Sequence, residues 1–214
     1  VYLANIRHAR QLREFILARG YDAVVCSHLF PMETLTFLRR HEDLPVRCYG
    51  VLSDYTCIPF LAETELDGYF LPHTDVRADC VSAGMPAEKL IVSGMPVAAK
   101  FTAPMTKQAA RELLGLPQDK RIYLIMTGGI GCGDAVTLCE AIRRVPDEDA
   151  LLCVLPGRNE ELRTTLEEKY AGHGVLTVPF TDQVPAYMHA ADVLLSKAGG
   201  ISSSEAAMLG VPLV

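Results

Sequence analysis

Residues 192–214 read DVLLSKAGGISSSEAAMLGVPLV, and this stretch decides how the fold of the chain is interpreted. The apolar run at 193–195 is typical of a buried parallel strand. Residues 196–200 (SKAGG) form a turn that only small residues make this tight. A helix is expected to begin at 201–205 (ISSSE), with serine hydroxyls able to cap it. Free backbone N–H groups and the helix dipole then converge on the turn, which predicts an anion site.

A second unit of the same kind lies in the middle of the chain. Residues 121–126 (RIYLIM) predict a strand, and residues 127–134 (TGGIGCGD) lead from it into a helix that runs to Arg144. Four glycines in six residues make this turn resemble a dinucleotide-binding loop. Either turn alone is also an ordinary connection of an α/β protein. The pair favours a phosphate site, in which Glu205 could accept hydrogen bonds from a sugar diol.

Composition excludes several classes of protein. Of the 214 residues, 50% are hydrophobic and 21% are charged, which is typical of a globular protein. No apolar run approaches the roughly 18 residues that a membrane-spanning helix needs. The net charge of −6 is spread evenly over both halves, so we expect no nucleic-acid partner. Seven cysteines without a C-x-x-C pair indicate reduced thiols in a cytoplasm, and neither zinc nor disulfides.

Strands and helices alternate along the first half, which predicts parallel strands with crossover helices. Ligands of such sheets gather beyond the carboxyl ends of the strands, where His28 and Asp54 fall. The expected elements are helix 6–19, strand 23–27, helix 32–40, strand 46–53, strand 68–71, helix 75–83 and strand 90–93.

Residues 93–104 (SGMPVAAKFTAP) look like a hinge, because proline and glycine crowd their beginning. We therefore place one domain at 1–104 and a second at 105–214. The chain begins inside a helical approach and ends on what looks like an unfinished strand at 212–214. We expect it to be part of a longer protein. The second domain is expected to contain helix 107–114, strand 121–126, a helix to 144, strand 151–155, a helix to 170, strand 175–178 and helix 183–190.

Five motifs together resemble the diacylglycerol glycosyltransferases, which include bacterial processive diacylglycerol glucosyltransferases and plant monogalactosyldiacylglycerol synthases. The motifs are SDYTCIPF at 53–60, SGMPVAAKF at 93–101, MTGGIGCG at 126–133, PGRN at 156–159 and the stretch from PFTDQ at 179–183 to the end. The resemblance implies a GT-B fold, with two Rossmann-like domains whose parallel sheets face a cleft and are here incomplete at their outer ends. It also implies inverting transfer of a hexose from UDP-glucose or UDP-galactose to diacylglycerol, without a metal or other cofactor.

Carried over residue by residue, the resemblance implies a donor site in the second domain. Phe180 and Thr181 would hold the uracil edge, Glu205 the ribose hydroxyls, and Arg158 the negative charge of the leaving UDP. Without the resemblance, Arg158 is equally an ordinary solvent-exposed arginine, and Lys197 either a phosphate contact or a lysine at a strand end. The remaining donor-site residues are Gly128, Gly129, Gly131, Asn159, Gly199, Gly200, Ser202 and Ser203.

The chain also departs from the family pattern. The family's glycine-rich loop with its catalytic histidine would precede Val1, and the loop that grips the donor sugar would follow Val214. We therefore expect this chain to fold and bind UDP without catalysing transfer. His28 and Asp54 are the groups available for acid–base or positioning work. The alternative for His28 is a histidine satisfied by backbone, and for Asp54 a helix or turn cap.

Apolar residues of the first half are the expected lipid contacts, in loops where a diacylglycerol tail could lie, with core packing as the alternative. They are Phe30, Pro31, Tyr55, Ile58 and Phe60. The resemblance implies a cytoplasmic enzyme bound peripherally to the inner face of the cell membrane.

Two other interpretations stay open. A UDP-sugar 2-epimerase would use the same two-domain fold on a soluble substrate, but it leaves the DYTCIPF stretch unexplained. A nucleotide-binding module without turnover is the second alternative.

Overall fold

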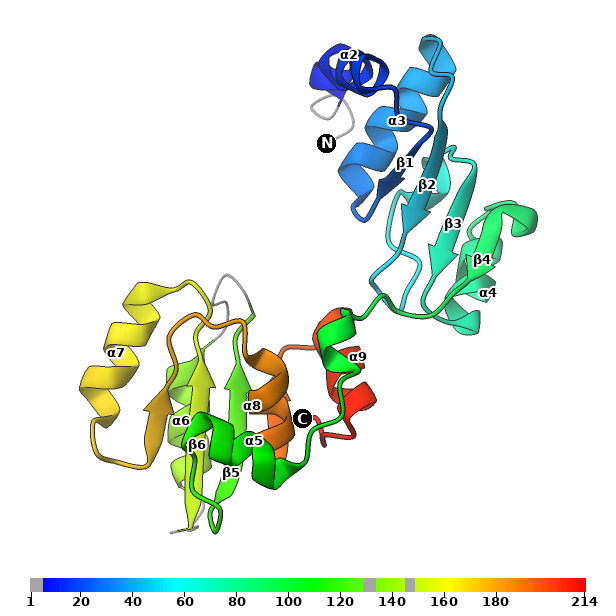
Figure 1. Cartoon of the computed structure of the whole chain (residues 1–214). Helices are drawn as coiled ribbons and strands as arrows, with labels where there is room; N and C mark the ends of the chain where they lie inside the picture. Colours follow the sequence, from blue (N-terminus) through cyan, green and yellow to red (C-terminus); the bar gives the residue numbers. More distant parts are fainter. Residues whose placement is uncertain (1–5, 129–133, 145–148) are drawn as a thin grey trace. The chain divides into compact units, whose positions relative to one another are not determined.

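The computed structural model describes residues 6–128, 134–144 and 149–214, which divide into two compact units. Unit 1 extends to Pro96 and unit 2 begins at Val97. Each contains its own four-stranded parallel sheet (Figure 1). This confirms the predicted α/β class with two Rossmann-like units.

Unit 1 is built on a sheet whose strand order, β1-β2-β3-β4, follows the order of the chain. All three strand pairs are parallel, so a crossover segment must return the chain between successive strands. The strands are β1 (Ala23–Cys26), β2 (Arg47–Val51), β3 (Gly68–Leu71) and β4 (Leu90–Val92). The helices are η1 (Ile6–His8), α2 (Ala9–Arg19), α3 (Leu29–His41), η2 (Leu61–Glu63), α4 (Thr74–Ser82) and η3 (Ala87–Lys89).

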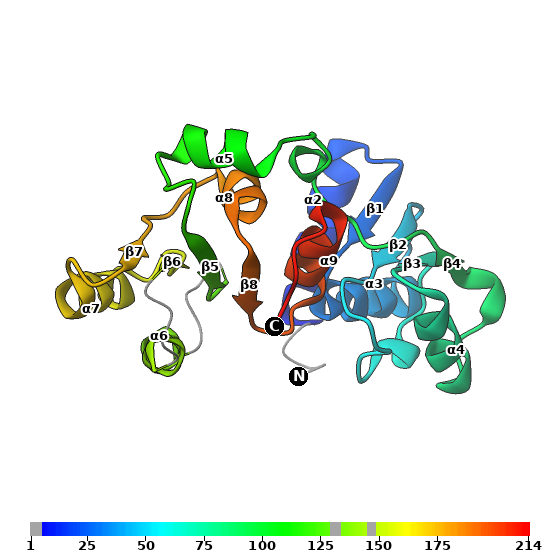
Figure 2. The ribbon, with the colours of Figure 1, turned by 90° about the horizontal axis from the view of Figure 1, so that it is seen from below.

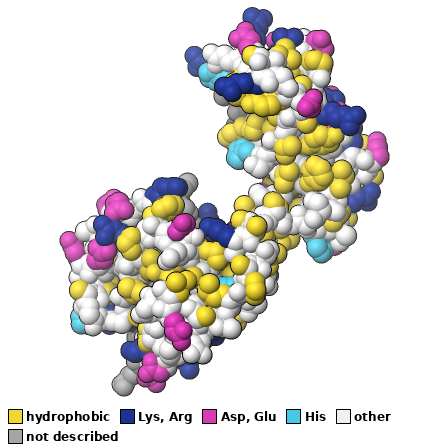
Figure 3. Space-filling model, in the orientation of Figure 1, with side chains coloured by type: hydrophobic (Ala, Val, Ile, Leu, Met, Phe, Trp, Pro, Cys, Tyr) yellow, Lys and Arg dark blue, Asp and Glu magenta, His cyan; other side chains and the backbone are white. Residues whose placement is uncertain are grey.

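The two faces of this sheet differ. Cys48, Tyr69 and Leu71 point into the core that the helices cover, and each is at most 1% exposed. Because side chains alternate along a strand, Val25 and Ile91 lie on the opposite face, where they are 62% and 44% exposed. Figure 3 shows hydrophobic side chains gathered over the strands of this unit.

Unit 2 has the strand order β7-β6-β5-β8, with helices on both faces. Figure 2 shows α6 and α7 on one face of the sheet, and α5 and α8 on the other. A parallel bridge joins Leu213 to Leu194, beside β8. The strands are β5 (Arg121–Met126), β6 (Ala150–Leu155), β7 (Val175–Thr177) and β8 (Val193–Ser196). The helices are η4 (Ala99–Phe101), α5 (Lys107–Leu114), α6 (Ala135–Arg143), α7 (Glu160–Tyr170), α8 (Val184–Ala190) and α9 (Gly200–Leu209).

The near-continuous apolar runs of the central strands follow from burial on both faces. In β5, Leu124 joins the core beneath α5 and α8, whereas Ile125 joins the core beneath α6 and α7. In β6, Cys153 likewise joins the core beneath α5 and α8, and Val154 joins the core beneath α6 and α7. This sheet is therefore a rigid platform for the loops at its edge.

The predicted strands and helices other than α3 agree with the observed ones to within two residues at each end, whereas the short helices η2, η3 and η4 were not predicted. Helix α3 begins at Leu29, so Phe30 and Pro31 are helical and do not lie in the expected loop. Proline is tolerated there because N–H groups in the first turn have no partner within the helix. The division between the units lies at Pro96, inside the predicted hinge and before the expected boundary at 104. The reason is Phe101, which is 3% exposed in the core of unit 2.

Candidate functional site

The carboxyl ends of β5 and β8 form the floor of the candidate site. The chain builds the sheet outward from β5 through β6 to β7, and then returns to place β8 on the other side of β5. Ligands of open parallel sheets bind beside such a reversal. The Ser196 hydroxyl donates to the Met126 carbonyl across the two strands, at 3.3 Å. Gly128 and Lys197, which follow these strands, are therefore brought together.

Gly128 and Lys197 meet above this floor. Gly128 has a φ of +79°, a backbone conformation that glycine adopts without cost. A Cβ atom at this position would lie 3.3 Å from Cε and 3.6 Å from Nζ of Lys197. The lysine side chain therefore extends across the glycine and brings its ammonium group to the end of β5.

The N-terminus of α9 faces the same edge without a side-chain cap. The N-cap residue is Gly199, so the cap position has no side chain that could accept a first-turn N–H. The prediction that serine hydroxyls cap this helix is wrong. The Ser203 hydroxyl donates to the Gly199 carbonyl at 2.8 Å, and the Ser204 hydroxyl donates to the Gly200 carbonyl at 2.6 Å. Because these hydroxyls bond backward to carbonyls, the helix dipole and the first-turn N–H groups remain for an anion.

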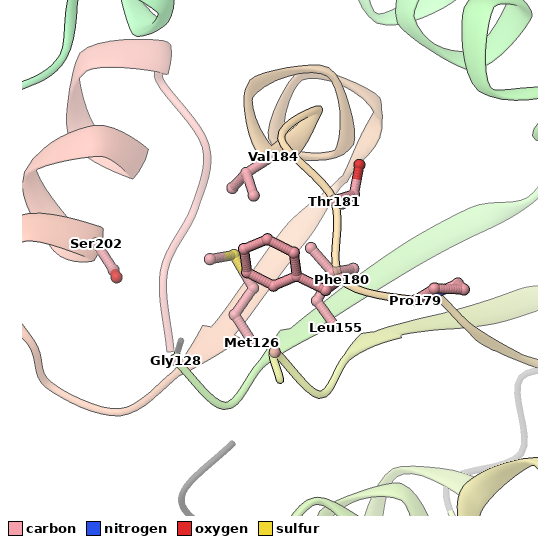
Figure 4. A pocket seen from close by; sticks show the side chains of 9 residues that line it. Met126, Gly128, Leu155, Pro179, Phe180, Thr181, Val184 and Ser202 are labelled. Carbon is pink, nitrogen blue, oxygen red and sulfur yellow. The ribbon is translucent and has the colours of Figure 1, made fainter. Parts of the chain in front are cut away.

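An apolar pocket of about 130 Å³ lies beside this helix terminus. It is smaller than the roughly 300–1,000 Å³ of a typical ligand site, so it suits one ring of a larger ligand. Figure 4 shows Ser202, on α9, standing across the pocket from Phe180 and Met126. The lining residues are Met126, Gly128, Leu155, Gly157, Pro179, Phe180, Thr181, Val184 and Ser202.

Arg158 lies over the ring of Phe180, with its guanidinium carbon 4.2 Å from the ring centroid. Phe180 is 53% exposed and forms one wall of the pocket. Asn159 caps α7, because its side-chain oxygen accepts the N–H of Leu162 at 2.9 Å. The predicted role of Arg158 at the diphosphate stays a prediction, while the structure adds a cation–π contact that sequence reasoning missed.

Glu205 is half-buried in the second turn of α9. Burial raises the pKa of its carboxyl group, and the charge of Lys100 acts in the opposite direction. Lys100 belongs to η4 and also donates to the Asp182 carbonyl at 3.2 Å. Lys100 is a residue of this site that the sequence analysis did not single out, although it lies in the quoted SGMPVAAKF motif. Two further predicted residues, Gly129 and Gly131, lie outside the described residues.

In unit 1, His28 and Asp54 follow the carboxyl ends of the paired strands β1 and β2. His28 caps α3, since its Nδ1 atom accepts the N–H of Phe30 at 3.3 Å. The two rings pack edge to face, with centroids 4.6 Å apart. This cap agrees with the alternative of a histidine satisfied by backbone. The catalytic roles of His28 and Asp54 stay predictions.

The five predicted lipid contacts differ in exposure. Phe30, Tyr55 and Phe60 are 47%, 48% and 59% exposed, whereas Pro31 and Ile58 are half-buried. Ile58 packs against the core of unit 1, as the alternative of core packing expects. No helix in the described part of the chain is both long and apolar enough to cross a membrane. Among the same residues, no group of three or more His, Cys, Asp or Glu side chains could hold a metal ion.

Comparison with solved structures identifies the fold. UDP-N-acetylglucosamine 2-epimerase from Rickettsia bellii matches 96% of this chain and 58% of its own, with a TM-score of 0.67 at 16% identity. Anabaena Alr3699/HepE, solved in complex with UDP and glucose, matches 96% and 61%, with a TM-score of 0.61 at 14% identity. Similarity at this level shows the fold, which is that of GT-B glycosyltransferases and related epimerases.

Family comparisons are more specific. Residues 2–97 match the monogalactosyldiacylglycerol (MGDG) synthase family, and residues 131–214 match the C-terminal domain of glycosyltransferase family 28. The first half of the chain is therefore similar to MGDG synthases, and the second half to the C-terminal domain of family 28 glycosyltransferases. It is 27% identical over 209 residues to the processive diacylglycerol beta-glucosyltransferase of Bacillus cereus (strain AH187), covering 96% of this chain. The chain spans about half the length, 53%, of that curated relative.

Proposed function

We propose that this chain carries the UDP-sugar site and part of the acceptor site of an enzyme that transfers a hexose from UDP-glucose or UDP-galactose to diacylglycerol, with inversion. One observation carries the proposal. A pocket of single-ring size and an uncapped helix terminus meet at the strand reversal of a domain that matches the glycosyltransferase family. The name of the Bacillus cereus relative supports diacylglycerol as the acceptor.

In the proposed donor complex, the pocket takes the uracil ring, with Phe180 stacking against it and Thr181 offering backbone groups at its edge. The ribose diol donates two hydrogen bonds to Glu205, which must be ionised to accept both strongly. Burial raises the pKa of this carboxyl group, so UDP affinity should fall as the pH is lowered.

The diphosphate lies between Gly128 and the N-terminus of α9, where Gly200 and Ser202 supply N–H groups. The N–H groups of Gly199 and Ser203 donate instead to the carbonyls of Lys197 and Gly199, at 2.7 and 3.0 Å. The ammonium group of Lys197 beside Gly128 supports this placement. Positive charge fixed in advance stabilises the charge that develops on the departing UDP. The reaction as proposed needs no metal or other cofactor, because the UDP-sugar is itself the substrate.

For acid–base or positioning work at the acceptor hydroxyl, Asp54 is better suited than His28. A neutral histidine whose Nδ1 accepts a hydrogen bond carries its proton on Nε2. His28 would therefore lose its cap on α3 if it took up a second proton. The exposed rings of Phe30, Tyr55 and Phe60 suit contact with acyl chains. We place the enzyme peripherally on the inner face of the cell membrane.

The test is to incubate the full-length enzyme with labelled UDP-glucose or UDP-galactose and diacylglycerol micelles. Labelled glycolipid supports the proposal. A free epimerised sugar nucleotide, formed without lipid, would instead support the epimerase that the fold comparison leaves as the alternative. UDP binding is measured separately by calorimetry on this 214-residue chain. UDP bound equally well after Glu205→Gln would contradict the ribose assignment.

A further inference from the structure

Lys100 lies in η4, the short helix that begins unit 2. The next residue, Phe101, is 3% exposed and packs in the core of that unit. The ammonium nitrogen of Lys100 lies 5.6 Å from the centroid of the Phe101 ring. A buried aromatic anchor thus holds the segment in place, and the lysine side chain starts from a defined position.

From this position Lys100 reaches the loop that carries the base pocket. Its Nζ atom donates to the backbone carbonyl of Asp182 at 3.2 Å, across 82 residues of sequence. Asp182 directly follows Thr181, which lines the pocket. The Thr181 hydroxyl closes the same loop by accepting the N–H of Gln183 at 3.1 Å. Lys100 therefore ties η4 to the loop at the edge of the pocket.

The charge of Lys100 also acts on Glu205. Helix α9 packs against η4, α8 and β8. The titratable or charged groups on or next to these elements are Lys100, Tyr187, His189, Asp192 and Lys197. Of the charges in the described residues, that of Lys100 opposes the effect of burial on the pKa of Glu205.

We propose that Lys100 is a positioning residue of the nucleotide site, which holds the base loop and the ribose-binding helix α9 in the arrangement that UDP requires. This inference rests on the proposed function, in which Thr181 and Glu205 contact the base and the ribose. Lys100 does not itself touch the nucleotide. It acts by fixing the Asp182 carbonyl and by keeping Glu205 ionised for the diol.

The experiment measures UDP affinity of the 214-residue chain by calorimetry from about pH 8 down to about pH 4.5, a range in which a carboxyl group of raised pKa titrates. Lys100→Met should bind UDP about two- to fivefold more weakly, as expected for loss of one exposed charge interaction. Its affinity should also begin to fall at a higher pH than that of the wild type, because Glu205 loses the charge that favours ionisation. Lys100→Arg should restore the wild-type pH profile.

Lys169→Met is the matched control. Lys169 is also exposed, and its ammonium nitrogen lies 5.6 Å from the ring centroid of the next residue, Tyr170. It pairs with Glu140 on α6 and lines no part of the pocket. The control changes the net charge by the same amount, so it should leave both the UDP affinity and its pH profile unchanged.

A second readout does not depend on UDP. In the free protein, the pKa of the Glu205 carboxyl group, followed by carbon-13 NMR, should rise in Lys100→Met and stay unchanged in Lys169→Met. A wild-type pH profile and an unchanged Glu205 titration in Lys100→Met, with UDP binding weakened by Glu205→Gln, would overturn this inference alone. Absence of UDP binding by the wild-type chain would overturn the proposed function and this inference with it.

Discussion

Replacing Phe180 by alanine should weaken UDP binding about tenfold. The ring forms a wall of the pocket in which the base is proposed to stack. Loss of an aromatic stacking partner costs about 1–3 kcal/mol per base, which corresponds to about 5- to 160-fold in affinity. Phe180 is 53% exposed and already carries Arg158 against its ring, so we expect a value in the lower half of that range.

Phe15→Ala is the control for stability. Phe15 lies in unit 1, is 51% exposed and has the guanidinium group of Arg19 5.3 Å from its ring centroid. Each truncation removes a similar area, worth up to about 2 kcal/mol of folding free energy. A difference in UDP affinity between the two variants therefore reports the pocket and not the stability of the fold.

Calorimetry with UDP, at a temperature where both variants are folded, tests whether Phe180 stacks on the base. UDP bound by Phe180→Ala within twofold of the wild type, or an equal loss in Phe15→Ala, would refute the stacking assignment. The double variant Arg158→Met/Phe180→Ala separates two roles of the arginine. If Arg158 acts through the ring, Arg158→Met should have little further effect once the ring is gone. A full effect in that background would support the predicted phosphate contact.

Three further outcomes are expected. Gly128→Ala should weaken UDP binding and lower the Tm, since a side chain at a φ of +79° costs about 1–2 kcal/mol and meets Lys197; an unchanged titration and melting curve would contradict this. Arg111→Met should lower the free energy of unfolding, measured in urea, by about 3–5 kcal/mol, because its buried guanidinium pairs with Asp192 at 2.8 Å. Lys107 pairs with the same carboxylate from a half-exposed position, so Lys107→Met should lower the free energy of unfolding by about 1 kcal/mol or less. Burial raises the pKa of Asp192, but hydrogen bonds and charges from Lys107, Ile122 and Arg111 lower it overall. The stabilisation of the fold by ionised Asp192 is therefore present above the unfolded pKa and is lost as the pH falls through the folded pKa. The difference in unfolding free energy between Arg111→Met and the wild type should accordingly become smaller in acid. EDTA should leave the transferase activity of the full-length enzyme intact, and activity that requires added magnesium or manganese would contradict the proposed electrostatics.

The secondary structure of this chain could be predicted because its signals are local. Strand 121–126 and helix 107–114 have the predicted bounds, and Gly20 and Gly115 end their helices in the left-handed conformation. The spacing of hydrophobic residues and the position of glycines act over only a few residues, so the sequence alone determined the bounds of these elements. The start of α3 was missed because its signal is a histidine cap, which common N-cap preferences do not include.

The candidate site depended on both the local sequence and the tertiary structure. From the sequence alone came the two glycine-rich turns, and the motifs brought the family resemblance. That Gly128 and Lys197, one from each turn, lie at one site follows from the placement of β8 beside β5, which no local pattern specifies. The contacts of Arg158 with Phe180 and of Lys100 with Asp182 are likewise tertiary. Residues separated by about 20 to 80 positions in the sequence come into contact only once the strands have taken their order in the sheet. Burial of the whole core determines that order, and no single segment does.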